Sequence, residues 1–109
     1  MKHGNALGDD MTGPALAGRV RDLMPQLTAE LAGLVAIPSV SEAGFPAASR
    51  PALLQARDAV AVLLADAGCE RVSSLDLPDT APLLTAEIPA PDGAPTVLLY
   101  SHWFPESPR

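Results

Sequence analysis

The sequence predicts an α/β chain in which two amphipathic helices are followed by three short strands. Apolar residues recur at steps of three and four in two segments, 14–36 and 51–67, and this spacing places them on one face of a helix. Three shorter apolar segments follow at 71–77, 83–88 and 96–100, each with the length and composition of a strand. With 109 residues, the chain is long enough for one domain with a modest core.

The first predicted helix carries its apolar residues on a single face. They are Leu16, Val20, Leu23, Leu27, Leu31 and Leu34. Pro25 lacks a backbone N–H, so the sequence predicts that this helix is kinked or split there, with the stronger half at 26–36. Pro38 disfavours helical angles at Ile37, so the helix is expected to end before it.

The second predicted helix follows a loop rich in Ser, Pro and Gly. It is expected to begin near Pro51, because proline suits the first turn of a helix. Its apolar face consists of Leu53, Ala56, Val60, Leu63, Leu64 and Ala67. Gly68 is suited to the position just after the helix, where a left-handed backbone is favoured.

The three strand segments differ in pattern, which allows a prediction of their pairing. The first, 71–77, alternates only loosely between apolar and polar residues. The turn-like segment PAPDGAP separates 83–88 from 96–100, so these two are predicted to pair as an antiparallel hairpin. Because 96–100 is apolar on both faces, it is expected to lie deeper in the sheet than the other two.

The composition excludes some classes of function. A net charge of −6, with seven basic residues spread along the chain, argues against nucleic acid or an anionic membrane as a partner. Residues 1–12 have neither an apolar period nor the pattern of a secretory signal, so we expect a flexible tail and a cytoplasmic protein. The single cysteine, Cys69, excludes a disulfide within the chain.

His102 is the main candidate for a functional residue. It stands at the end of the 96–100 segment, where α/β proteins place ligand-binding residues. A catalytic zinc needs three protein ligands, yet the other histidine, His3, lies in the predicted tail. No other metal, nucleophile or phosphate-binding motif occurs in the sequence. Position alone therefore leaves two roles open for His102, a surface or capping residue and a metal ligand.

Three longer motifs occur in a characteristic order. They are LAGLVAIPSVSE at 31–42, ARDAVAVLLADAGCERV at 56–72 and APLLTAEIPAPDGAPTVLLYSH at 81–102. Together they resemble the N-terminal part of the co-catalytic zinc peptidases. This family includes dipeptidases, carboxypeptidase G-like enzymes, acetylornithine deacetylases and succinyl-diaminopimelate desuccinylases, and the dipeptidase branch is the most similar. The resemblance implies that 13–102 forms part of a zinc-exopeptidase (phosphorylase/hydrolase-like) domain, with two N-terminal helices packed on a small mixed sheet.

The resemblance also implies a metal site. His102 matches a histidine that binds one of two zinc ions in the family, whose members hydrolyse peptide or N-acyl amide bonds in small substrates. In the family an Asp two residues later orients this histidine, whereas this chain has Phe104, whose ring cannot accept an imidazole N–H. The family's other ligands and its general base have no counterpart here, so His102 remains as the single ligand. No catalytic residue is assigned, and tight zinc binding by this chain is not expected.

The last segment, WFPESPR at 103–109, departs from the family pattern and is expected to be a disordered tail. The sequence is interpreted as a truncated, frameshifted family member that is inactive as this chain, although a short protein with its own tail is the competing interpretation. Two other functions stay open. One is a non-enzymatic interaction protein that binds a partner, or itself, through an exposed sheet edge. The other is one half of a metallopeptidase split over two chains.

Overall fold

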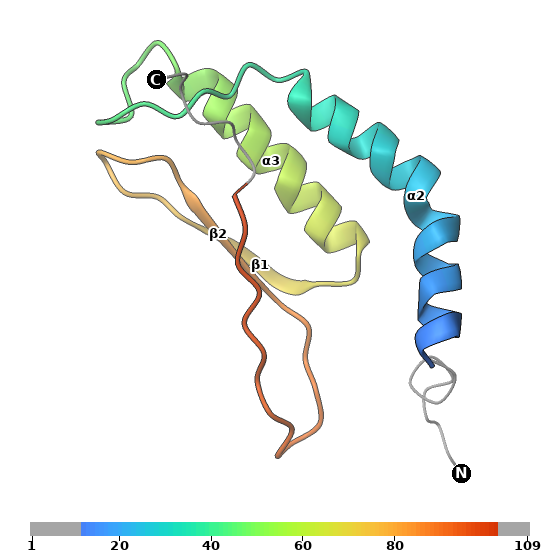
Figure 1. Ribbon diagram of the computed structural model, residues 1–109. Coiled ribbons are helices and arrows are strands. Elements are labelled where there is room, and N and C mark those ends of the chain that lie inside the picture. The colour runs from blue at the N-terminus through green and yellow to red at the C-terminus, as the bar shows by residue number, and fades with distance from the viewer. Residues whose placement is uncertain (1–11, 103–109) are drawn as a thin grey trace. The chain divides into compact units, whose positions relative to one another are not determined.

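The computed structural model describes residues 12–102 and shows a small α+β arrangement of two helices and a two-stranded antiparallel sheet (Figure 1). The elements are the helices α2 (Gly13–Val35) and α3 (Arg50–Asp66), and the strands β1 (Glu70–Leu75) and β2 (Leu83–Glu87). The two helices were predicted. The mixed sheet of three strands was not correct for the described residues, because the sheet there has two antiparallel strands.

The chain divides into two compact units, Met1–Gly33 and Leu34–Arg109. The first contains most of α2, and the second contains α3, β1 and β2. The predicted tails at 1–12 and 103–109 lie outside the described residues, with the exception of Thr12. No helix in the described part of the chain is long and apolar enough to cross a membrane.

Helix α2 is continuous through Pro25, so the predicted split does not occur. Figure 1 shows the helix bending in its middle, as expected where proline removes one backbone hydrogen bond. Thr12 begins the helix, because its side-chain oxygen accepts a hydrogen bond from the Ala15 N–H at 3.3 Å. The helix ends at Val35, before Pro38, as predicted.

Helix α3 has the ends that its sequence predicts. Pro51 lies in the first turn, where its missing N–H removes no intrahelical bond. At the other end Gly68 adopts a left-handed backbone with φ +98°. Its N–H donates to the Ala65 carbonyl, and the Cys69 N–H donates to the Leu64 carbonyl, both at 3.0 Å. These two bonds form the Schellman pattern that ends a helix after a glycine.

Strand β1 pairs with β2, in a register that places Ser73 opposite Thr85 and Leu75 opposite Leu83. The predicted hairpin between 83–88 and 96–100 was wrong, because 96–100 belongs to no strand. The segment between those two runs contains three prolines, Pro89, Pro91 and Pro95. Proline has no N–H to donate to a neighbouring strand, so these three residues disfavour hydrogen bonding between the two runs near the turn.

The 96–100 segment was predicted to be the deepest strand, and this was also wrong for the described residues. It belongs to no strand, and its side chains are exposed. The exposed fractions are 78% for Val97, 89% for Leu98, 88% for Leu99 and 74% for Tyr100. The sequence pattern of a buried strand is therefore present without the neighbours that would bury it.

Most buried residues of the second unit lie on α3 or in the loop that precedes it, and Pro82, just before β2, is buried as well. Leu53 and Ala56 face inward from α3, and Ser39 and Phe45 are buried in the loop. Phe45 has a left-handed backbone with φ 49°, which is uncommon for a bulky residue. The Arg50 side chain makes two contacts with Phe45. Its guanidinium lies 4.7 Å from the centre of the phenyl ring, and it also donates a hydrogen bond to the Phe45 carbonyl at 2.9 Å.

Candidate functional site

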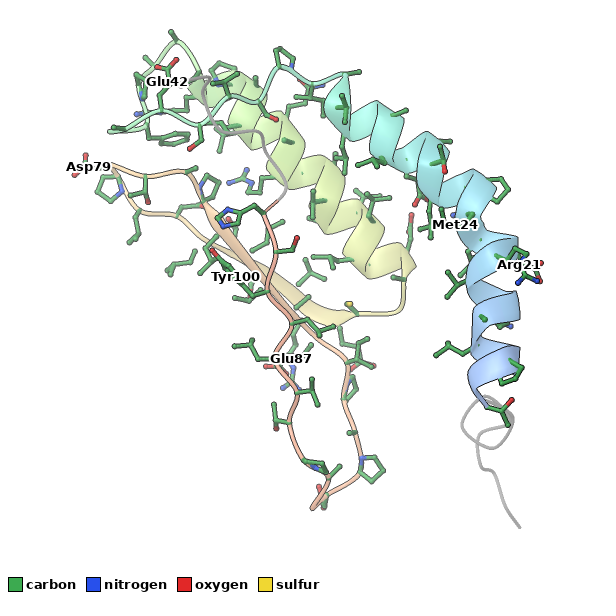
Figure 2. All side chains as sticks on the ribbon, in the orientation of Figure 1. Arg21, Met24, Glu42, Asp79, Glu87 and Tyr100 are labelled. Atoms are coloured by element: carbon green, nitrogen blue, oxygen red, sulfur yellow. The ribbon has the colours of Figure 1, made fainter. Side chains whose placement is uncertain are left out.

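His102 lies at the exposed end of the 96–102 segment, next to Tyr100, which is labelled in Figure 2. The Tyr100 hydroxyl and Nε2 of His102 are 2.9 Å apart, and the two rings meet edge to face with centroids 5.2 Å apart. Residues two apart in an extended segment point to the same side, which explains why the two side chains meet. When Nε2 accepts the phenolic hydrogen, the imidazole carries its proton on Nδ1. Tyr100 therefore orients the imidazole that the sequence singled out.

The residues present do not fit a zinc site by themselves. No group of three or more His, Cys, Asp or Glu side chains that could hold a metal ion occurs within residues 12–102. A zinc ion takes at least three protein ligands, and His102 offers one, with its Nε2 already bonded to Tyr100. Phe104, which stands where the family has an Asp, lies outside the described residues. We therefore derive no metal-dependent step from this chain alone.

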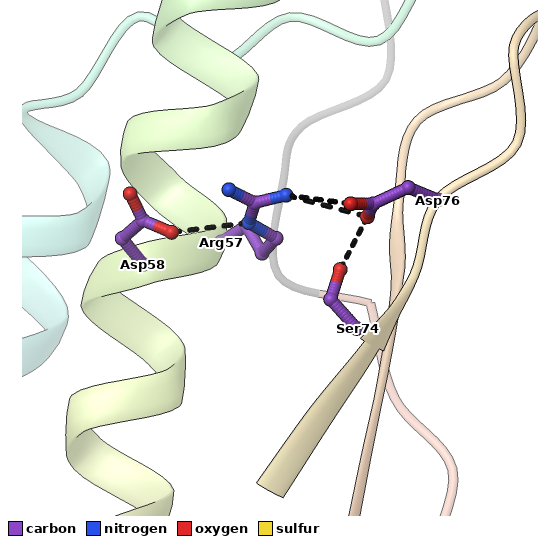
Figure 3. A network of polar contacts seen from close by, with 4 residues as sticks. All are labelled: Arg57, Asp58, Ser74 and Asp76. Carbon is purple, nitrogen blue, oxygen red and sulfur yellow. Dashed lines mark hydrogen bonds and ion pairs between the residues drawn. The ribbon is translucent and has the colours of Figure 1, made fainter.

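A second polar cluster, which sequence reasoning missed, connects α3 to the end of β1 (Figure 3). Nη1 of Arg57 lies 3.3 Å from each carboxylate oxygen of Asp76, and Nε of Arg57 donates to Asp58 at 3.0 Å. Ser74 also donates a hydrogen bond to Asp76. The sequence shows Arg57 only as a polar residue beside the apolar face of a helix, because the contact with Asp76 spans nineteen residues. The cluster joins a helix to the end of a strand through Arg57 and Asp76, so we assign it a structural role.

The strand pair carries a cross-strand ion pair beside an irregularity. Nη2 of Arg71 lies 2.7 Å from Oε2 of Glu87. Arg71 has φ 52°, and the register shifts between Glu70 and Ser73, which marks a β-bulge. Both side chains are mostly exposed, so this pair contributes little to stability.

Ser39, in the first of the resembling motifs, gains no base from the described residues. Ser39 is 1% exposed, and within the described part of the chain its Oγ has no hydrogen-bond partner. A nucleophilic serine needs a base within hydrogen-bond reach. The described residues contain one histidine, His102, which contacts Tyr100. Ser39 is therefore a buried polar group with an energetic cost and no assigned chemistry.

Comparisons with protein-family models, with curated proteins and with solved structures gave no match for this chain. The resemblance to the co-catalytic zinc peptidases therefore stays a prediction from the order of three sequence motifs. The fold that can be stated is the coarse one, two helices with a small antiparallel sheet.

Proposed function

We propose that this chain corresponds to the N-terminal part of a zinc-dependent dipeptidase or amidohydrolase, and that it does not hydrolyse peptide or N-acyl amide bonds by itself. Two features support the proposal. The first is the order of the three motifs, of which the third ends at His102. The second, which supports the inactivity, is that the described residues 12–102 contain no group of three or more side chains that could hold a metal ion.

The inactivity is tested with the purified chain, supplied with zinc or cobalt and a panel of dipeptides and N-acyl amino acids. The matched control is His102→Ala, which removes the candidate ligand from an exposed position and leaves the buried residues unchanged. We expect neither protein to turn over any substrate faster than a chelator-treated sample. Turnover that the His102→Ala substitution abolishes would show that the chain assembles an active site.

The family assignment is tested separately, at the level of the gene. If the chain derives from a zinc peptidase, translation of the DNA downstream of codon 102 in all three frames should reveal the missing ligands. The expected signs are an Asp two residues after the histidine and, later, a pair of adjacent Glu residues. If a separate neighbouring reading frame encodes them, the two products form a split enzyme. Their absence from every frame and from neighbouring genes would overturn the assignment.

A second candidate function is binding of a protein partner through the 96–100 segment. The observation that favours it is the exposure of Val97, Leu98, Leu99 and Tyr100, which form a continuous apolar run outside any strand. An extended peptide with free backbone groups can add to the edge of a sheet in another protein. This function differs from the first in its test, because it requires neither metal nor His102.

The two candidate functions are separated by one pair of variants. Leu98→Lys changes the apolar run, and His102→Ala changes the candidate ligand a few residues away. Loss of partner binding in Leu98→Lys alone would favour the interaction protein. Complementation of a separately expressed C-terminal half, lost in His102→Ala and kept in Leu98→Lys, would favour the peptidase.

A further inference from the structure

The described part of the first unit contains no helix or strand besides α2, so no other described element of this unit covers the apolar face of the helix. Six of its side chains have exposed fractions between 44% and 61%, and at 100° per residue they fall within an arc of about 100°. We call these residues the α2 stripe, and they are Leu16, Val20, Leu23, Met24, Leu27 and Leu31. A continuous stripe of this kind on a helix of 23 residues is the usual form of a helix-packing surface.

Two opposite charges border the α2 stripe on the same side. Arg19 and Glu30 are separated by eleven residues, which places them about 20° apart around the helix axis and about 16 Å apart along it. The distance is too great for an ion pair within one helix. Nε2 of Gln26 donates to Oε1 of Glu30 at 2.9 Å, which keeps the carboxylate on this side. Arg21 borders the stripe on the other side, near the uncharged Thr28.

We propose that the α2 stripe binds the α2 stripe of a second copy of this chain, with the two helices antiparallel. When two identical helices pack antiparallel, each side of one stripe lies next to the same side of the other stripe. Arg19 of each copy therefore meets Glu30 of the other copy if the two-fold axis passes between Met24 and Pro25. This axis crosses the middle of the α2 stripe, so the stripes of the two copies overlap along most of their length. A parallel pair would instead bring Arg19 beside Arg21 of the second copy, with like charges in contact.

Pro25 is compatible with this arrangement. At 100° per residue it lies about 150° from the centre of the α2 stripe, so its ring points away from the second helix. A proline on the outer side also bends a helix toward its inner side. The bend in α2 therefore does not interrupt the surface that we assign to the dimer.

The experiment measures the oligomeric state of the whole 109-residue chain by sedimentation equilibrium over a wide range of concentration. We expect a monomer–dimer equilibrium. Arg19→Glu should raise its Kd about tenfold, because two exposed ion pairs are lost and replaced by repulsion. The double variant Arg19→Glu with Glu30→Arg should restore the original Kd. Arg21→Glu is the control, because it changes the net charge as much as Arg19→Glu does but on the other side of the α2 stripe. This substitution should leave the Kd unchanged.

Rescue by the double variant is specific to the proposed pair, because Arg19 and Glu30 are too far apart to interact within one copy. Circular dichroism should show that each variant keeps its helix, because none of the substituted side chains is buried. A wild-type chain that is monomeric at every concentration would overturn the proposal. So would a dimer that is insensitive to Arg19→Glu, which would locate the interface elsewhere, such as at 96–100. Failure of the double variant to restore association would exclude the antiparallel register.

Discussion

Arg57 and Asp76 join the middle of α3 to the residue that follows β1, with Nη1 of the arginine 3.3 Å from both carboxylate oxygens. The arginine side chain is only 20% exposed, whereas the Asp76 side chain is 62% exposed. The pair links the helix to the end of the strand, and its contribution to net stability is small because Asp76 remains largely in solvent.

We expect Arg57→Met to lower the free energy of unfolding by about 1 kcal/mol, because the substitution keeps the aliphatic contacts of the side chain and removes its charge. Urea denaturation followed by circular dichroism measures the change. Arg21→Met is the matched control, since Arg21 is an exposed residue of α2, and it should have little effect. Equal losses in the two variants would show that the Asp76 contact is unimportant.

Gly68→Ala should destabilise the chain by about 1 kcal/mol, because alanine disfavours the left-handed backbone that ends α3. A Cβ at this position would meet no atom within 4 Å, so the cost comes from the backbone and not from a clash. Gly33→Ala is the comparison, because Gly33 lies inside α2 and also has space for a Cβ. There the same substitution should increase helicity. Thermal unfolding measures the stability of both variants. A change of stability in the same direction in the two variants would contradict this account of Gly68.

Ser39→Ala should leave stability unchanged or increase it by about 1 kcal/mol, because it removes a buried hydroxyl that lacks a partner in the described residues. Ser49→Ala should instead be destabilising, since Oγ of Ser49 donates to the Pro46 carbonyl at 3.2 Å. Urea midpoints of the two variants give the comparison. A clear loss of stability in Ser39→Ala would show that its hydroxyl bonds to a group outside residues 12–102.

Leu98→Lys should reduce aggregation of the chain without lowering its stability, because Leu98 is 89% exposed and belongs to an uncharged, β-prone run free of proline. Val62→Lys provides the control, because Val62 is an exposed apolar residue of α3 outside that run. Light scattering during incubation reports aggregation, and unfolding curves report stability. The same reduction in both variants would indicate a general effect of charge and not a role for 96–100.

The sequence by itself determined the helices and their ends. Pro38 stops α2, Pro51 opens α3, and Gly68 closes it, and each effect depends on the conformations of a few adjacent residues. Helical periodicity was equally local, so the extent of both helices was predicted to within a few residues. The continuity of α2 through Pro25 was the exception, because proline can bend a helix without dividing it.

Only the tertiary structure decided which strands pair, which apolar residues are buried, and where Arg57 finds its carboxylate. An apolar run such as 96–100 shows that a segment suits a strand, but its burial depends on neighbours that the run does not specify. The β1–β2 pairing and the Arg57–Asp76 contact join residues that are distant in sequence. Their formation depends on the closure of loops and on packing between elements, for which local sequence carries no direct signal. The arrangement of Tyr100 and His102 was predictable only in part. Residues two apart in an extended segment point to the same side, which the sequence indicates, but their hydrogen bond depends on the side-chain conformations.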